Sequence, residues 1–247
     1  KVNPTVGSVE HFVVGSIDLS AYIAEGADTP KMNSALIAGD RLFVSMQRLD
    51  ANWQAQTAYV AVIDLASGEE IDTDPQTDGL AGISLEGINP ATMVLHNGRI
   101  LITNRGDYAN NSGTLEAIDT TTYARTTLAD GDSFPQYHRN LDDDDASNDV
   151  IYHFQDVAIA SDQRAYLLLS QEKGAISIEG QLLPFDPSTA TFADSISSTL
   201  PALDGQPLGD INVGPESRLW VSIKNLQAPS IAVIDSDTHT LNGELIE

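Results

Sequence analysis

The apolar positions of this chain fall into short runs that recur four times behind the same kind of turn. Each run begins with an arginine and continues with four or five mainly apolar residues. A shorter apolar segment precedes each run, so each pair is expected to form a hairpin with a short turn. The four runs are GDRLFVSMQ (39–47), NGRILITNR (97–105), DQRAYLLLSQ (162–171) and ESRLWVSIK (216–224), with Arg41, Arg99, Arg164 and Arg218.

A second pattern follows each hairpin. It is an apolar strand that ends on aspartate, then a turn rich in Ser, Thr, Gly or Pro, then a more polar strand. An aspartate side chain can accept backbone N–H bonds two residues further on and so close a turn. The four aspartates, Asp64, Asp119, Asp186 and Asp235, are therefore interpreted as turn residues and not as catalytic ones.

Each unit therefore contains four antiparallel strands, and the arginines are 58, 65 and 54 residues apart. This repetition predicts an all-β fold of β-propeller blades. The spacing exceeds the usual period of about 40–50 residues, so long loops must hold the excess. We expect one propeller domain over 1–247, with full units at roughly 31–80, 88–130, 150–200 and 206–247.

The N-terminal part adds only half a unit. HFVVGSIDLSAYI (11–23) matches the aspartate-ended hairpin, with Asp18 at the aspartate position, and predicts a partial blade at 11–30. A propeller with an uncovered blade exposes an apolar face and a sheet edge. Missing upstream blades, as in a larger propeller of for example seven blades, are the favoured explanation. Another subunit could instead complete the blade, or residues 1–10 could cover it.

The repeats resemble the YVTN family of β-propeller repeats. The resemblance is carried by RILITNRGDYANNSGTLEAIDTTTYA and RLWVSIKNLQAPSIAVIDSDTHT, and it extends over nearly the whole chain from about residue 11. Proteins with such repeats are commonly surface, periplasmic, lipoprotein-like or secreted proteins of bacteria and archaea. The resemblance thus implies an extracytoplasmic location and is specific for the fold more than for an activity.

The charge of the chain restricts its partners. There are 36 acidic residues against 12 Lys and Arg, a net charge of −24. Such a surface repels nucleic acids and anionic lipids, so a protein or a surface polymer is the expected partner. The acidity suits solubility in a salty or extracellular setting, or divalent-cation binding. The chain has no cysteine, and no apolar run reaches the length of a membrane span.

An acidic run is the first candidate metal site. Calcium takes six to eight oxygen ligands, which aspartates in a loop can supply. The run lacks the glycine and distal glutamate of an EF-hand, and a solvated loop is the competing interpretation. The candidate ligands are Asp142, Asp143, Asp144, Asp145 and Asp149.

Two histidines flank this run. His138 and His153 could bind a metal together with Asp142 or Asp156. The alternative is that one histidine lies on the surface and the other is packed in the core.

A further candidate is a ring of polar residues at the start of the inner strands. Such residues line the mouth of a propeller channel, where ligands bind. The ring consists of Asn33, Asn89, Asp156 and Asp210. The alternative is turn chemistry, because Asn and Asp favour turns at strand entries.

No nucleophile elbow, HExxH motif or phosphate-binding glycine loop is present, and no catalytic residue is assigned. The sequence favours a non-catalytic propeller that binds a partner protein, surface polymer or small ligand through long loops and the channel mouth. A calcium-dependent propeller hydrolase or lyase is the alternative. A surface-layer or filament subunit, completed by a neighbour, is a second one.

Overall fold

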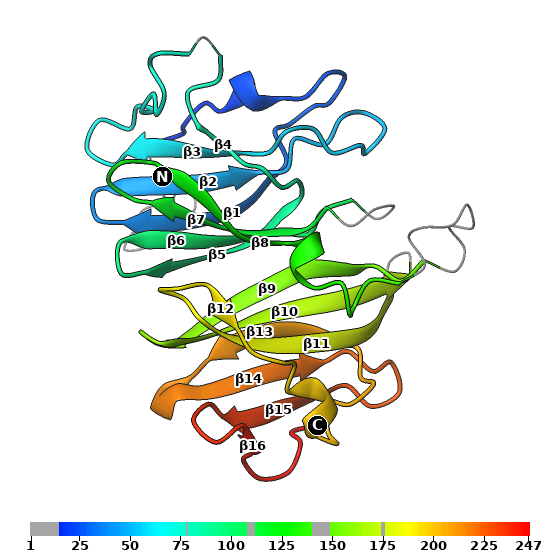
Figure 1. The fold of residues 1–247 in the computed structure, drawn as a ribbon. Helices are drawn as coiled ribbons and strands as arrows, with labels where there is room; N and C mark the ends of the chain where they lie inside the picture. The colour runs from blue at the N-terminus through cyan, green and yellow to red at the C-terminus, as the bar shows by residue number, and fades with distance from the viewer. Residues whose placement is uncertain (1–14, 78, 108–111, 140–148, 174–175) are drawn as a thin grey trace, which may run out of the picture. The chain divides into compact units, whose positions relative to one another are not determined.

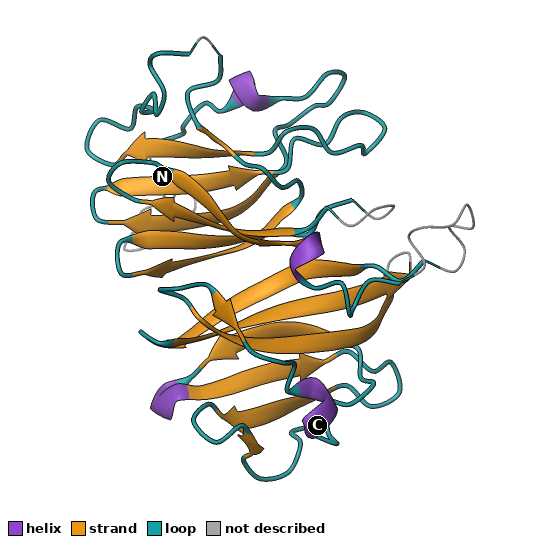
Figure 2. Ribbon diagram, in the orientation of Figure 1, coloured by secondary structure: helices purple, strands orange, loops and turns teal. Residues whose placement is uncertain are grey.

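The structure is a computed structural model, and it describes residues 15–77, 79–107, 112–139, 149–173 and 176–247. The chain forms two compact units, 1–84 and 85–247, and each is described by itself. Strands dominate the described residues, with short 3₁₀ turns between them (Figure 2). No helix in these ranges has the length and apolarity that a membrane crossing requires.

The first unit contains one four-stranded antiparallel sheet. Its strands are β1 (Met32–Ala38), β2 (Arg41–Met46), β3 (Tyr59–Asp64) and β4 (Ile83–Ser84), paired in chain order. β2 and β3 supply a fully buried apolar centre, because both are continuous apolar runs.

The partial N-terminal blade differs from the expectation. Its first segment, 11–14, lies outside the described residues. Where the second strand was expected, the structure has a 3₁₀ turn, Ser20–Tyr22. Asp18 still closes a local turn, since its carboxylate accepts the Ser20 N–H at 2.9 Å. Tyr22 is fully buried against the first sheet, and its hydroxyl accepts the Gly82 N–H at 2.6 Å and donates to Glu70. Because the Tyr22 ring is buried and its hydroxyl has two polar partners, this segment packs on the first sheet as a turn and not as a strand.

The second unit contains three further four-stranded antiparallel sheets (Figure 1). The second sheet has β5 (Pro90–His96), β6 (Arg99–Asn104), β7 (Thr114–Asp119) and β8 (Arg125–Asp130). The third has β9 (Tyr152–Ser161), β10 (Arg164–Lys173), β11 (Ile176–Asp186) and β12 (Thr191–Phe192). The fourth has β13 (Leu208–Val213), β14 (Arg218–Ile223), β15 (Ser230–Asp235) and β16 (Thr240–Leu241). The innermost strands are neighbours, because β9 contacts both β5 and β13.

The repeated arginines and aspartates behave as the sequence predicts. Each of the four arginines begins the second strand of its sheet. In three sheets it pairs in register with the turn aspartate, as Arg41 does with Asp64. That aspartate accepts the backbone N–H groups of Ala66 and Ser67 at 2.9 and 2.8 Å. Asp119, Asp186 and Asp235 form the same turns.

Side chains alternate across each second strand and so give every sheet two faces. We call the face with the first, third and fifth residues after the arginine the leading face, and the face with the second and fourth the trailing face. The trailing face of the second sheet, with Leu101, packs on the leading face of the third, with Leu167. The trailing face of the third, with Tyr166, packs on the leading face of the fourth, with Val221. These two apolar contacts form the core of the second unit.

The two ends of the sheets in the second unit differ. At one end the connections are short turns: 97–98, 120–124, 162–163, 187–190, 214–217 and 236–239. Because the strands are antiparallel, the other connections emerge at the opposite end; their described residues include 105–107, 131–139, 193–207 and 224–229. We call this the loop end. In the first sheet the corresponding connection is 47–58.

Candidate functional site

One position of the innermost strand is polar in all four sheets. The next residue along the strand pairs with the third residue after the arginine: Ala35 with Val44, Met93 with Ile102, Val157 with Leu167 and Ile211 with Val221. The equivalent polar residues are therefore Ser34, Thr92, Asp156 and Asp210. The predicted ring contains two of these four, Asp156 and Asp210.

The structure shows why Asn33 and Asn89 were assigned to the wrong position. All four innermost strands have a bulge beside this position. The polar position lies seven residues before the arginine in the first two sheets and eight before it in the last two, because β9 has a second bulge before Ser161 and the turn 214–217 is longer than the others. Asn33 therefore lies one residue before Ser34, and Asn89 lies three residues before Thr92. Asn89 has a left-handed backbone with φ +56° and donates from its side chain to the Gly106 carbonyl at 2.9 Å. It supports the turn at the entry to β5.

The bulges have a repeated polar partner. In three sheets the hydroxyl of the fourth residue after the arginine accepts the N–H of the polar position. The distances are 3.1 Å for Ser45 and Ser34, 3.1 Å for Thr103 and Thr92, and 2.7 Å for Ser222 and Asp210. The third sheet has Leu168 there instead, which pairs directly with Asp156. A buried amide needs such a partner.

Asp156 links two consecutive sheets. Its carboxylate accepts the N–H of Val157 and the N–H of Ile211 in the next sheet, both at 2.8 Å. The hydroxyl of Thr92 in the preceding sheet also helps to lower its pKa. Burial raises the pKa of Asp156, which these hydrogen bonds oppose. The side chain is buried and both of its oxygens accept hydrogen bonds, so it connects the innermost strands.

Asp210 has the same position in the fourth sheet but a different environment. Its side chain is 68% exposed, and its closest cationic partner is Lys224, whose Nζ lies 3.7 Å from the carboxylate. An ion pair that exposed contributes little to stability. Asp210 is thus free to contact another molecule in a way that Asp156 is not.

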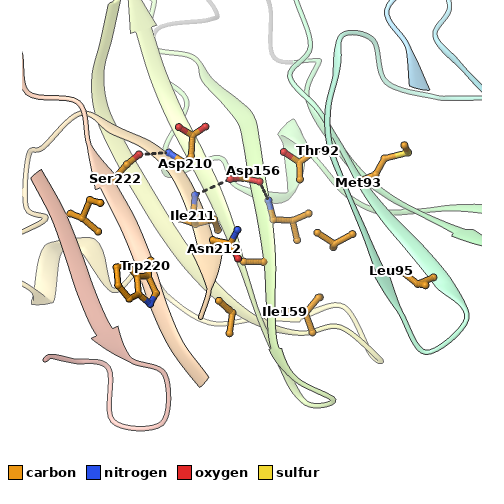
Figure 3. A pocket seen from close by; sticks show the side chains of 15 residues that line it. Thr92, Met93, Leu95, Asp156, Ile159, Asp210, Ile211, Asn212, Trp220 and Ser222 are labelled. Atoms are coloured by element: carbon orange, nitrogen blue, oxygen red, sulfur yellow. Dashed lines mark hydrogen bonds between the residues drawn. The ribbon is translucent and has the colours of Figure 1, made fainter. Parts of the chain in front are cut away.

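Both aspartates border one cavity of about 660 Å³ in the second unit (Figure 3). The innermost strands form its first wall, with Thr92, Asp156 and Asp210 at its polar part. The trailing face of the fourth sheet forms its second wall, with Asn212, Trp220, Ser222 and Ile231. Asn33 borders a separate cavity of about 330 Å³ in the first unit, together with Leu42, Val44 and Ile63.

The predicted calcium site falls largely outside the described residues, since only Asp149 of its five aspartates is described. One carboxylate oxygen of Asp149 is buried without a hydrogen-bond partner. Among the described residues no three His, Asp or Glu side chains are grouped so that they could hold a metal. Calcium binding stays a prediction.

Both flanking histidines are buried, whereas the alternative interpretation placed one on the surface. His138 accepts the Tyr152 N–H at 3.4 Å, and burial and the neighbouring His153 lower its pKa to about 4. The ring of His153 bonds the Arg105 carbonyl at 3.0 Å, and burial lowers its pKa too. Both therefore stay neutral at physiological pH and pack beneath the loop end. Asp156, which was expected to bind a metal with these histidines, forms the hydrogen bonds described above instead.

Two arginines stabilise the structure where these loops begin. Arg105 forms a part-buried ion pair with Glu172 of the third sheet. In the first unit Arg48 donates to the carbonyls of Tyr22 and Thr57, at 3.0 and 2.9 Å. Both arginines therefore serve the architecture below the loops.

Sequence reasoning missed an exposed aromatic residue at the loop end of the first sheet. Trp53, in the connection 47–58, is 70% exposed and has φ +63°. The Asp50 carboxylate holds this loop by accepting the N–H groups of Asn52 and Gln54 at 2.8 and 3.0 Å. The Lys31 ammonium lies 4.9 Å from the indole centroid. The signal in the sequence that could have identified this residue was a single Trp within a polar loop.

Comparisons with known proteins identify the fold. No protein-family model matches the sequence, and no curated protein matches it. A solved Dos1 propeller is similar at 13% identity and a TM-score of 0.50, over 82% of this chain and 44% of that one. Dihydro-heme d1 dehydrogenase NirN, solved in complex with DHE, is similar at 15% identity and 0.51, over 89% and 38%.

A gluconolactonase from Xanthomonas campestris is also similar, at 14% identity and a TM-score of 0.49, over 88% of this chain and 62% of that one. Identities this low show the fold alone. The four sheets and the two stronger similarities define the chain as a β-propeller of four-stranded antiparallel blades, as the repeats predict. The chain spans less than half the length of the Dos1 and NirN structures.

Proposed function

We propose that this chain is a non-catalytic, extracytoplasmic propeller module that binds a neutral surface polysaccharide through the 47–58 loop of its first sheet, with Trp53 as the anchor. The observation that carries the proposal is an indole that is 70% exposed on a loop already held by Asp50. A rigid aromatic side chain contributes contact area with little loss of conformational entropy.

The charge of the chain supports a neutral ligand. At a net charge of −24 the surface repels polyanions, so anionic polysaccharides are disfavoured. The extracytoplasmic location rests on the resemblance to surface and secreted YVTN-type propellers. The predicted ring also favours binding over catalysis, because the Asp156 carboxylate is occupied by the N–H groups of Val157 and Ile211.

A calcium-dependent hydrolase or lyase is the competing function. It requires a metal-binding group of side chains, for which the acidic run with Asp149 is the sequence candidate. Calcium titration of the native protein, followed by intact-mass and metal analysis, tests it directly. Stoichiometric calcium together with cleavage of any saccharide would replace the proposal.

The binding test is a fluorescence titration with a panel of neutral, anionic and cationic polysaccharides. A neutral polymer is expected to change the Trp emission, and Trp53→Ala is expected to weaken binding about tenfold or more, as truncation of an aromatic hot spot does. Trp53→Phe should restore part of the affinity. Thr121→Ala, an exposed residue of a short turn at the opposite end, is the matched control. Equal affinity of the Trp53→Ala variant and native protein would refute the assignment.

A further inference from the structure

The contact between the third and fourth sheets is closed by polar side chains at the end with the short turns. Arg164, which begins β10, donates to the Ser236 carbonyl and, at 2.6 Å, to the Asp237 carboxylate. Tyr166 donates its hydroxyl to the same carbonyl at 3.0 Å, and its ring centroid lies 5.8 Å from that of His239. Protein groups therefore occupy the space between the arginine and the facing turn.

The contact between the second and third sheets has the same positions with smaller or uncharged residues. The facing turns 187–190 and 236–239 are equivalent, because the aspartate before each accepts the N–H groups of the turn's second and fourth residues. The replacements are Leu101 for Tyr166, Ser188 for Asp237 and Ala190 for His239. The second contact therefore lacks the phenol, the carboxylate and the imidazole that fill the other one.

A cavity of about 150 Å³ is present at this place in the second contact. It is lined by His96, Asn97, Arg99, Leu101, Pro187 and Ser188. Leu101 and Pro187 are buried, so part of the wall is apolar. Since one water molecule takes about 30 Å³ in the liquid, the cavity has room for a ligand of about five non-hydrogen atoms.

Arg99, which begins β6 and borders this cavity, differs from the other three repeated arginines. Each of those has a carboxylate within 2.8 Å: Asp64 for Arg41, Asp237 for Arg164 and Glu216 for Arg218. Within the part of the chain that the structure describes, the Arg99 guanidinium has no hydrogen bond or ion pair. It is partly buried, so its charge is directed at a confined space.

Two carboxylates near Arg99 are already engaged. Asp119 pairs with Arg99 in the strand register, but the Thr122 N–H does most to lower the pKa of Asp119 and Arg99 contributes less. Asp162 is 81% exposed and accepts the Asn97 side-chain amide at 3.2 Å. Both negative charges repel a dianion more than a monoanion. The guanidinium therefore suits an anion with a single charge.

We propose that this cavity binds a small organic monocarboxylate. The carboxylate of the ligand takes the place that the Asp237 carboxylate has in the next contact, and it accepts hydrogen bonds from Arg99. A guanidinium presents its N–H groups in a planar fork that matches a carboxylate. The short apolar part of the ligand lies against Leu101 and Pro187. This site shares no residue with the Trp53 loop and does not depend on polysaccharide binding.

The first experiment titrates ¹⁵N-labelled native protein with formate, propionate and octanoate at constant ionic strength. Saturable NMR shifts are expected at Asn97, Arg99 and Ser188. Affinity should be higher for propionate than for formate, because buried CH₂ groups add apolar contact. It should fall for octanoate, which exceeds the cavity. Sulfate, a dianion, should bind more weakly than propionate. No saturable shift with any of the acids would overturn the proposal, as would tighter binding of sulfate.

The second experiment fills the site from within the chain. Ser188→Asp places a carboxylate at the position equivalent to Asp237, so it should occupy Arg99 and weaken propionate binding about tenfold or more. Because Ser188 is exposed, this variant is expected to fold. Arg99→Gln should weaken binding to a similar extent. Arg218→Gln is the matched control, because it removes an equivalent arginine that already has the Glu216 carboxylate.

The two variants at the site test the proposal independently. If Arg99→Gln fails to fold, Ser188→Asp still decides, because it keeps the guanidinium and changes only what occupies it. Native affinity for propionate in Ser188→Asp would show that the acid binds elsewhere and would overturn the proposal. The same holds if Arg218→Gln weakens binding as much as Arg99→Gln does, since the effect would then be one of overall charge.

Discussion

The third and fourth sheets present the same positions in two environments. Asp156 and Tyr166 face a neighbouring sheet and are buried, whereas Asp210 and Trp220 have the same places and are exposed. The residue types are similar, so the neighbour decides whether a carboxylate joins strands or stays available. In a repeat protein each unit buries its faces only through its neighbours, and matched substitutions in the two sheets can measure that effect.

The largest expected difference concerns the apolar residue of the third strand. Leu182→Ala should lower the free energy of unfolding by about 2–5 kcal/mol, since it opens a cavity in the core between the third and fourth sheets. Ile231→Ala, at the equivalent but partly exposed position, should cost less than about 1 kcal/mol in dilute protein. Urea unfolding of both variants checks the pair. Equal costs would mean that the trailing face of the fourth sheet is already covered.

The next difference concerns the two aspartates. Asp156→Ala removes an acceptor shared by the third and fourth sheets and leaves buried donors unpaired, at a cost of about 1–3 kcal/mol for each unsatisfied group. Asp210→Ala removes an exposed ion pair and should change stability by less than about 0.5 kcal/mol. Thermal unfolding in low and high salt checks both, because only the Asp210 effect should depend on salt. A large, salt-independent cost of Asp210→Ala would contradict the comparison.

The pH dependence of Asp156 sharpens the same comparison. Its folded pKa is raised above the ordinary value of 3.8 by burial, so the folded state binds the proton more tightly than the unfolded chain. The stability that results is fully present below pH 3.8 and is lost as the pH rises through the folded pKa. The free-energy difference between native protein and Asp156→Asn should therefore shrink as the pH rises above about 4. A difference that grows over this range would reverse the assigned sign.

These comparisons also show how far the sequence predicts the fold. The arginines and aspartates recur because hairpins and aspartate turns are local, and local chemistry can be read from a few residues. The bulges of the innermost strands and the unequal turns after them cannot be read in this way, so the ring of Asn33, Asn89, Asp156 and Asp210 included two residues out of register. The burial of Tyr22 depends on its hydrogen bonds with Gly82 and Glu70. These residues are far away in the sequence, so no local pattern reveals the contact.

The candidate site was less predictable than the fold for a related reason. Trp53 differs from other aromatic residues only in being exposed, and Trp220 only in that its equivalents are buried. Exposure is a property of the neighbours and not of the residue. The sequence could identify the polar residues near the innermost strands. It could not show that the Asp156 carboxylate is buried and hydrogen-bonded whereas the Asp210 carboxylate is exposed.

A smaller expected effect concerns the bulge hydroxyls. Thr103→Val keeps the shape of a fully buried side chain but leaves the Thr92 N–H without its acceptor, at a cost of about 1–2 kcal/mol. Ser222→Ala, at the equivalent but half-buried position, leaves the Asp210 N–H able to bond water and should cost about 0.5 kcal/mol or less. Chemical denaturation, with amide hydrogen exchange at Thr92 and Asp210, measures both. A cost of Ser222→Ala as large as that of Thr103→Val would show that the Asp210 N–H has no access to water.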